Sequence, residues 1–379
     1  MTINTIRYQV LASPRASFAD RVASVLSQAS QPGKNLIPVR LVIFGNPANS
    51  ETYRKEFAYI KQAISACFGN RAPAFSYLAQ PPVGTGMFAE LHLLEYHNES
   101  LFFGTFETVP YVTVTTPFSK ELFVGGFMAS DYTLPVSAQA KEIFAQIARC
   151  LQSEAMPVWS IIRQWNYIEK ITQTDSNGIQ HYQAFNDARS AFYSTAPWSG
   201  GYPAATGIGT TCGGVVIDLE ATLSFSDQIV ARAIDNKLQI SAHAYSQKVL
   251  HGKADVPGCG KSTPKFERAK AWMDSEKQRL YISGTAAIRG ELSIGTDNVT
   301  EQTRITLENM EFLARQANPE AAESAEPPFT LLRIYLKDPA FRNKVETVLE
   351  SHYNGVPAIW VTADVCRDEL LVEIEGMSR

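Results

Sequence analysis

The stretch FTLLRIYLKDP, residues 329–339, decides the fold, because two other parts of the chain repeat its pattern and its surroundings. It has the composition of an apolar strand, with one arginine, Arg333, inside it. A segment with apolar residues at helical spacing follows (340–355), and then the strand-like PAIWVTADVCRDELLVEIEG (357–376). Strand, helix and strand therefore form the repeating unit of this sequence.

The same order occurs twice earlier in the chain. The matching first strands are IPVRLVIFGNP (37–47) and PVWSIIRQWNYI (157–168). Three arginines and three acids hold matching places in the first and last strands of the repeats: Arg40, Arg163 and Arg333, and Glu90, Asp218 and Glu373. This consistency predicts an α+β fold of three pseudo-threefold-related units, each a β-sheet with two helices packed on one face. We place them at residues 1–100, where part of the unit is missing, 101–228 and 229–379.

Composition indicates a globular protein with a large core, because 45% of the 379 residues are hydrophobic and 19% are charged. A net charge of -4 argues against binding to nucleic acid or to an anionic membrane surface. No apolar run approaches about 18 residues, so we expect no membrane span. MTINTIRYQV at the N-terminus does not resemble a signal peptide, and a cytoplasmic location is expected.

The cysteines are widely spaced and show no CxxC pair or neighbouring histidine cluster. They are Cys67, Cys150, Cys212, Cys259 and Cys366. This pattern indicates reduced thiols, not a disulfide framework or a zinc site. The glycine-rich stretch 199–214 is no dinucleotide fingerprint either, because the strand-like VVIDLEA follows it where a helix would be needed.

The closing segment LLVEIE (370–375) alternates in polarity, so one face of a continuous strand would carry Leu371, Glu373 and Glu375. Two interpretations are open. The acids could mark a solvent-facing sheet edge, or a carboxyl in an apolar cleft could have a raised pKa and act as a proton donor. Cys366 lies an odd number of positions from Glu373, so a site that uses both needs an irregularity between them.

Buried arginines raise a similar choice. Arg163 and Arg333 lie inside strongly apolar strands, and Arg189 lies in FNDARSAFY (185–193), which has a helical pattern. A buried guanidinium left unpaired is costly, so each must find an acid. The partner is either a structural acid of a neighbouring unit or the carboxylate of a ligand.

Several of these segments together resemble the chorismatase family. The resemblance to the C-terminal part of that family rests on FERAKAW (266–272), LYISGTAAIRGELSIGTDNVTEQTRITLENMEFLA (280–314), LLRIYLKD (331–338) and ADVCRDELLVEIEG (363–376). WNYI (165–168), FNDARSAFY and PAATGIGT (203–210) resemble the middle unit of the family. The resemblance covers most of residues 155–376. Chorismatases consist of three units akin to the trimeric Rid (YjgF-type) fold, which agrees with the repeat.

The resemblance implies hydrolysis of the enolpyruvyl ether of chorismate, with no metal and no cofactor. The site is expected in the cleft between the central and C-terminal units. By motif position, Glu373 protonates the methylene carbon. Arg189 and Arg333 are the candidates for binding the two carboxylates of chorismate, and Tyr245 for donating a hydroxyl. Three units in one chain are compatible with a monomer.

Pyruvate is one product, and the second is either 3-hydroxybenzoate or a dihydroxycyclohexadiene carboxylate. In the resemblance, Cys366 points to 3-hydroxybenzoate and Ala287 to the diene. We expect 3-hydroxybenzoate, serving the biosynthesis of a secondary metabolite, and we count Cys366 with Glu373 among the catalytic candidates and Ala287 among the residues that contact substrate.

Two other functions remain open. One is a Rid-like protein that binds a small carboxylate without catalysis. The other is an imine hydrolase, which is disfavoured because Rid imine deaminases carry a substrate-binding arginine at about the position of Ala358 in this chain.

Overall fold

Three mixed β-sheets form the centre of the molecule in the computed structural model, which describes residues 2–84, 86–251, 260–319 and 327–378. The first sheet has the order β1 (Ile6–Ser13), β4 (Met87–Glu95), β2 (Leu36–Gly45), β3 (Ala74–Ala79). The second has the order β5 (Ser100–Phe106), β6 (Val109–Thr115), β7 (Ser119–Met128), β10 (Val215–Ser224), β8 (Ile161–Glu169), β9 (Ala204–Thr210). The third has the order β11 (Val230–Ile234), β12 (Ala269–Met273), β13 (Gln278–Thr285), β18 (Val372–Met377), β16 (Leu331–Leu336), β17 (Ala358–Thr362). A short hairpin, β14 (Ile288–Arg289) and β15 (Leu292–Ser293), follows β13.

Two helices accompany each sheet. They are α1 (Phe18–Ala29) and α2 (Ser50–Phe68), α3 (Val136–Ser153) and α4 (His181–Tyr193), and α5 (Val299–Ala317) and α6 (Arg342–Tyr353). Helix α2, α4 or α6 connects the parallel strand pair of its sheet, as the repeated strand–helix–strand pattern predicts. Polar side chains cap the start of three of the helices, since Ser17 accepts from the Asp20 amide, Asn49 from the Thr52 amide and Asn298 from the Glu301 amide.

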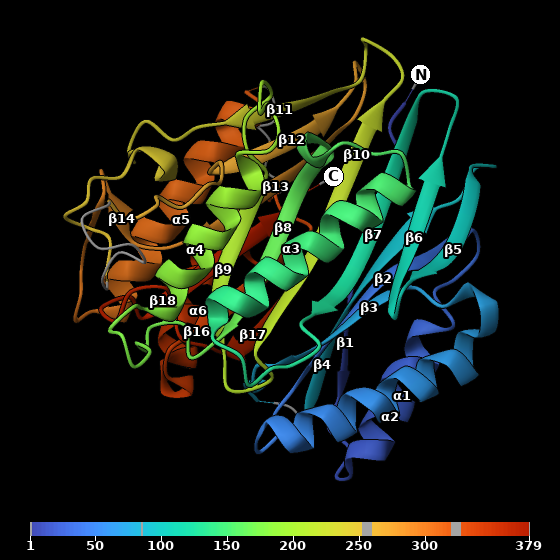
Figure 1. Ribbon diagram of the computed structural model, residues 1–379, viewed down its shortest axis with the longest axis horizontal. Coiled ribbons are helices and arrows are strands. Elements are labelled where there is room, and N and C mark those ends of the chain that lie inside the picture. The colour runs from blue at the N-terminus through green and yellow to red at the C-terminus, as the bar shows by residue number, and fades with distance from the viewer. Residues whose placement is uncertain (1, 85, 252–259, 320–326, 379) are drawn as a thin grey trace.

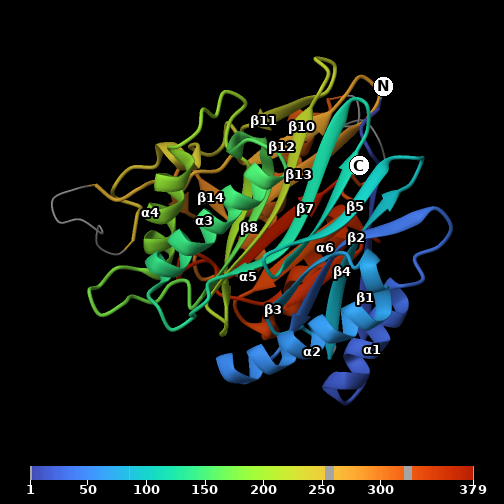
Figure 2. The same cartoon turned by 45° about the vertical axis from the view of Figure 1, so that its right-hand side comes forward.

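Helices lie on the outside, and the sheets face one another (Figure 1). Each helix pair buries its apolar face against its own sheet, in three separate hydrophobic clusters. A further cluster draws residues from all three sheets, including Phe44, Trp165 and Tyr335. The turned view shows α1 and α2 beside the first sheet and α3 and α4 beside the second (Figure 2). The α+β fold of three related units is thereby confirmed.

Strand pairing confirms the repeat residue by residue. Glu90 pairs with Val42, Asp218 with Trp165, and Glu373 with Tyr335, so the three acids occupy the same register position. Two residues further along the same strands stand His92, Glu220 and Glu375, each opposite the arginine of its sheet. The first sheet has four strands where the others have six, because it has no counterparts of β5–β6 and β11–β12. The exact division at residues 100 and 228 stays a prediction.

Candidate active site

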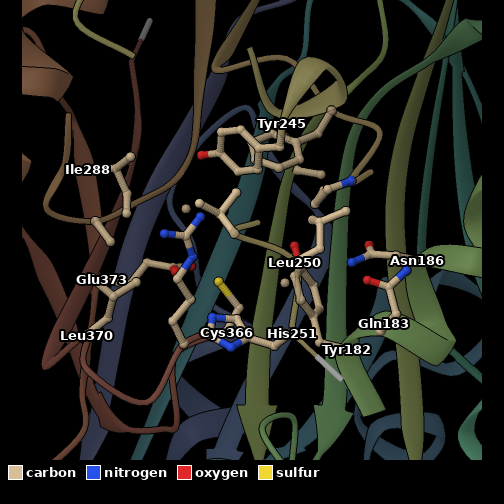
Figure 3. A pocket seen from close by; sticks show the side chains of 18 of the residues that line it. Tyr182, Gln183, Asn186, Tyr245, Leu250, His251, Ile288, Cys366, Leu370 and Glu373 are labelled. Carbon is tan, nitrogen blue, oxygen red and sulfur yellow. The ribbon is translucent and has the colours of Figure 1, made fainter. Parts of the chain in front are cut away.

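A pocket opens between the second and third sheets, where β9 lies against β13. The second unit contributes residues of α4 and β9, and the third contributes the loops around Tyr245 and Phe266, the end of β13, and the segment before and within β18. Figure 3 shows Glu373, Leu370 and Cys366 on one side of this pocket, with Gln183 and Asn186 across from them. The described lining is Gln180, Tyr182, Gln183, Asn186, Arg189, Ala205, Gly207, Tyr245, Val249, Leu250, His251, Pro264, Phe266, Arg268, Gly284, Ala286, Ile288, Cys366, Arg367, Leu370 and Glu373.

Glu373 is the buried acid of this pocket. Its strand, β18, is central in the third sheet because it pairs with both β13 and β16, so the solvent-facing edge suggested by the alternation is not found. The side chain is 4% exposed, and none of its described neighbours donates a hydrogen bond to the carboxyl. Burial, reinforced by the neighbouring Glu375 charge and opposed by Arg163 and Arg268, raises the pKa of Glu373 to about 8. The carboxyl is therefore mostly protonated at neutral pH.

Cys366 reaches the same pocket because the closing segment is no continuous strand. Regular pairing starts only at Val372, and residues 363–371 form an irregular connection from β17. The Asp364 carbonyl in this connection accepts from the Gly209 amide at 2.8 Å, which attaches it to β9. Burial, with the Glu373 charge as the next cause, raises the pKa of the Cys366 thiol to about 12. The sulfur is thus a neutral thiol at pH 7, not a thiolate nucleophile.

Three arginines at the pocket form no ion pair with any carboxylate in the described ranges: Arg189, Arg268 and Arg367. Arg189 projects from α4, is 1% exposed, and donates to Asn186 Oδ1 at 2.6 Å. Arg268 donates to the Ile240 carbonyl at 2.8 Å, and Arg367 to the Glu291 carbonyl at 2.9 Å. Buried guanidinium groups that lack an acid favour an anionic ligand.

Tyr245 lies at the pocket between two of these cations. Its hydroxyl accepts a hydrogen bond from Arg268 Nη2 at 2.6 Å. The centre of its ring lies 5.6 Å from Arg268 Cζ and 5.5 Å from Arg367 Cζ. The hydroxyl donates to no described residue, so its proton is available to another acceptor. Donation of this hydroxyl to a substrate stays a prediction.

Arg333 and Ala287 do not line the pocket. Arg333 is fully buried between the sheets, where it donates to Glu90 Oε1 at 2.6 Å and lies 3.2 Å from Glu375 Oε1. Of the two partners considered for this arginine, the structure therefore shows the structural one, an acid of a neighbouring unit. Ala287 is also fully buried, while its neighbours Ala286 and Ile288 contribute to the pocket wall.

Sequence reasoning missed several pocket residues, chiefly Arg268, Tyr182, Gln183 and Asn186. The last three share one face of α4 with Arg189, so polar residues at helical spacing beside Arg189 were a usable signal. Arg268 precedes a strand by one residue, and its spacing gives no indication of the pocket. Gly207 allows the Tyr182 ring to pack against the backbone of β9, because a Cβ at this position would lie 2.8 Å from that ring.

No metal site is evident in the described residues, where no group of three His, Cys, Asp or Glu side chains is arranged to hold an ion. None of the described helices combines the length and apolar character that crossing a bilayer requires. Cys67, Cys150, Cys212 and Cys366 are free thiols, and Cys259 lies outside the described residues.

Comparison with known proteins finds chorismatases among the relatives of this chain. Residues 118–221 match the family model described as "Chorismatase FkbO/Hyg5-like, N-terminal". A 3-hydroxybenzoate synthase of Streptomyces hygroscopicus is 31% identical over 231 residues, which cover 58% of this chain and 63% of the relative. A chorismatase of the same organism is 28% identical over 247 residues, 62% of this chain and 65% of the relative.

A solved chorismatase shares the architecture from end to end. It aligns with 100% of this chain and 100% of its own at a TM-score of 0.71 and 19% identity, which shows the common fold. The sequence matches span a little under two thirds of the relatives' length, 63% and 65%. By sequence and by fold, the chain is therefore related to the chorismatase family.

Proposed function

We propose that the protein is a cofactor-independent chorismatase that splits the enolpyruvyl ether of chorismate, with Glu373 as the proton donor. One observation carries the proposal: a carboxyl with no hydrogen-bond donor among its described neighbours, its pKa raised to about 8, sits in a pocket with three arginines that lack an acidic partner. Such a pocket suits a substrate with two carboxylates and a step that needs a neutral acid.

The chemistry follows from the enol ether. Glu373 gives its proton to the terminal methylene carbon, and the cation that forms is an oxocarbenium ion. The carboxylate left behind stabilises that cation electrostatically. Water then adds to the cationic carbon, and the resulting hemiketal collapses to pyruvate and the ring alcohol. The acid must be protonated before this step, which a raised pKa provides at neutral pH.

Arg189 and Arg268 are our candidates for the two substrate carboxylates, with Tyr245 held beside Arg268. Both guanidinium groups carry a buried Nε that hydrogen-bonds no described residue. Arg333 is set aside for this role, because its donors are already engaged by Glu90 and Tyr167.

For the second product we propose 3-hydroxybenzoate, with the diene as the alternative. Support comes from Cys366 in the pocket wall and from the Streptomyces relative described as a 3-hydroxybenzoate synthase. Atom balance separates the two products. The diene retains the water that hydrolysis adds, whereas 3-hydroxybenzoate forms only when the ring then loses its C4 hydroxyl and the hydrogen on C3 as water and becomes aromatic. Chromatography of the reaction mixture against both standards decides between them.

The test is incubation with chorismate while pyruvate is followed by a lactate dehydrogenase assay. Wild type should release pyruvate, and Glu373→Gln should lose at least about 10²-fold in kcat, the lower range for a general acid. The control is Glu350→Gln on the exposed side of α6, which should keep wild-type rates. Release of pyruvate no faster than without enzyme would refute the activity, and an unimpaired Glu373→Gln would refute the acid. Thermal stabilisation by chorismate analogues without turnover would favour a binding protein.

A further inference from the structure

The three sheets repeat one arrangement of buried polar groups, and the third repeat departs from it. Arg40, Arg163 and Arg333 occupy one register position, and Glu90, Asp218 and Glu373 occupy another. In the cyclic order of the sheets, the arginine of one sheet faces the acid of the next. Three equivalent ion pairs are expected from this symmetry.

Two of the three interfaces contain that pair. Arg333 Nη2 donates to Glu90 Oε1 at 2.6 Å, and Arg40 Nη2 donates to Asp218 Oδ2 at 2.6 Å. Asp218 also accepts from Ser76 Oγ at 2.5 Å and from the Gly126 amide at 2.7 Å. Asp218 is thus held by an arginine, a hydroxyl and a backbone amide.

At the third interface the corresponding donors bypass Glu373. Arg163 Nη2 donates to Glu375 Oε2 at 2.7 Å. Thr206, which has the register position of Ser76, donates its hydroxyl to the same oxygen. Trp165 Nε1 donates to Glu375 Oε1 at 2.9 Å. Glu375 thus binds Arg163 and Thr206, which are the equivalents of the arginine and the hydroxyl that bind Asp218.

The strand irregularity next to these acids also differs in position between the two sheets, and it follows the acid that is bound. In the second sheet the irregularity of β7 lies opposite Asp218, where the Gly126 amide reaches that acid. In the third sheet the irregularity of β13 lies opposite Glu375, and the Gly284 amide donates to Thr206 Oγ1 at 3.0 Å. Glu373 is left facing the pocket, with Gly284 providing the space for its carboxyl.

Charged and titratable groups from several elements surround Glu373, in addition to Tyr335, which pairs with it on the neighbouring strand β16. They are Glu375 on its own strand, Arg163 on β8, Arg268 just before β12, Tyr182 on α4 and Cys366 in the connection before β18. The pKa of Tyr182 is raised by burial, and that of the Cys366 thiol to about 12, so both stay neutral at pH 7. Glu375 raises the pKa of Glu373 by its own charge, and it binds Arg163, one of the two arginines that lower that pKa.

We propose that Glu375 is a positioning residue: by holding Arg163 and Thr206, it keeps both donors away from Glu373 and leaves that carboxyl free in the pocket. The inference rests on the proposed function insofar as Glu373 is the proton donor. Glu373 then differs from the structural acids Glu90 and Asp218 because of Glu375, two residues along the strand. Glu375 itself is not among the residues that line the pocket.

The test is Glu375→Gln, with the pH dependence of kcat/KM as the readout. The amide carries no charge and holds a guanidinium less strongly, so Arg163 should turn to Glu373 and favour its ionised form. Activity should therefore begin to fall at a pH lower by about 1 to 3 pH units than in wild type. At pH 7.5 a shift of about 2 pH units, the middle of that range, should lower the rate roughly 25-fold.

Two further variants separate positioning from a general loss of structure. Glu220→Gln removes the equivalent acid of the second sheet and should leave the pH profile unchanged. The double variant Glu375→Gln/Arg163→Met removes the cation as well, so its profile should return toward that of wild type. If the role of Glu375 were merely structural, the double variant would lose more activity than the single variant.

If Glu375→Gln does not fold, Thr206→Val replaces it. Valine is tolerated at this register position, since Val361 occupies it in the third sheet. The freed Gly284 amide could then reach Glu373.

Infrared difference spectroscopy gives a readout that needs no turnover. The carboxylic acid band that disappears in Glu373→Gln should be present in wild type at pH 7.5 and greatly reduced in Glu375→Gln. An unchanged band and an unchanged pH profile in the folded variant overturn the proposal. If wild type releases no pyruvate from chorismate, the proposed function fails, and the infrared band alone still decides the role of Glu375.

Discussion

Glu373 shows how one glutamate can differ from its structural equivalent Glu90 through its partners. Glu90 is held by Arg333, and its pKa is lowered well below the ordinary range by Arg333 and His92 in spite of burial. Glu373 has the same place in its sheet, yet burial dominates and its pKa rises to about 8. The chemical identity of the side chain is therefore secondary to whether a neighbouring arginine reaches it.

The pH dependence of the reaction should report this residue. Because the donor must be protonated, kcat/KM should be level below about pH 8 and fall tenfold per pH unit above it. An initial-rate profile with chorismate between pH 5 and about pH 10 measures this limb. A limb at the ordinary pKa of a glutamic acid would contradict the assignment.

Stability should depend on pH through the same group. In the unfolded chain Glu373 ionises near 4.5, and in the fold only near 8, so the folded state binds more protons between these values. Its contribution is favourable below about pH 4.5 and is lost progressively as the pH rises through 8. Glu373→Gln should therefore gain stability relative to wild type on going from pH 5 to pH 9, by up to about 1.4 kcal/mol per pH unit in that window. Urea denaturation at several pH values checks this, and an unchanging difference would contradict it.

At the scale of elements, the pocket depends on where regular strand structure stops. Residues 363–371 form a connection that no alternation rule describes, and this connection brings Cys366 into the same pocket as Glu373. On the other side, β13 is irregular between Ile282 and Thr285, which sets Gly284 directly against the Glu373 carboxyl. Both irregularities lie at the pocket, where they redirect side chains.

Gly284→Ala should disable the site while preserving the fold. A Cβ there would lie 2.9 Å from Glu373 Cδ and would also collide with Oε1, so the carboxyl must move. A displacement of this order costs about 10²-fold in kcat/KM. Gly200→Ala is the matched control, because its Cβ would meet nothing closer than 3.6 Å and should leave kinetics unchanged. Equal rates for the two variants would show that Glu373 needs no space at Gly284.

Elements were predictable from the sequence where periodicity and repetition coincide, as in the strand around Arg333 and the helix that follows it. The matching arginines and acids also indicated a repeated fold correctly. The partner of each arginine was not predictable, because Arg333 and Glu90 are 243 positions apart and meet only when three sheets close on one another. Arg268 was missed for a similar reason, since its place at the pocket depends on contacts between units and not on local spacing.

On the scale of the whole molecule, buried arginines hold the three sheets together. Arg40 joins the first sheet to Asp218 in the second, Arg163 joins the second to Glu375 in the third, and Arg333 joins the third to Glu90 in the first. All three arginines are fully buried, and Trp165 lies within 5.3 Å of each guanidinium carbon. This arrangement closes a ring of contacts at the centre.

Arg333→Met should therefore affect stability more than substrate binding. Loss of the arginine leaves Glu90 buried without its main partner, which typically costs about 3–5 kcal/mol of unfolding free energy. Urea denaturation measures this loss. Arg315→Met on the surface of α5 is the control and should change stability by no more than about 0.5 kcal/mol. A raised KM for chorismate at unchanged stability would instead return Arg333 to a substrate-binding role.

The central ring also has a consequence for stoichiometry. In a homotrimer, any substitution appears at all three interfaces at once, so an interface cannot become reactive without its copies changing too. Here the three units are joined in one polypeptide. The interfaces at Glu90 and Asp218 keep their arginine–acid ion pairs, whereas the sequence at the Glu373 interface can change independently. Covalent linkage thus permits two interfaces to stay structural while the third becomes the proposed reactive site, and a titration with a tight inhibitor should count one equivalent per chain.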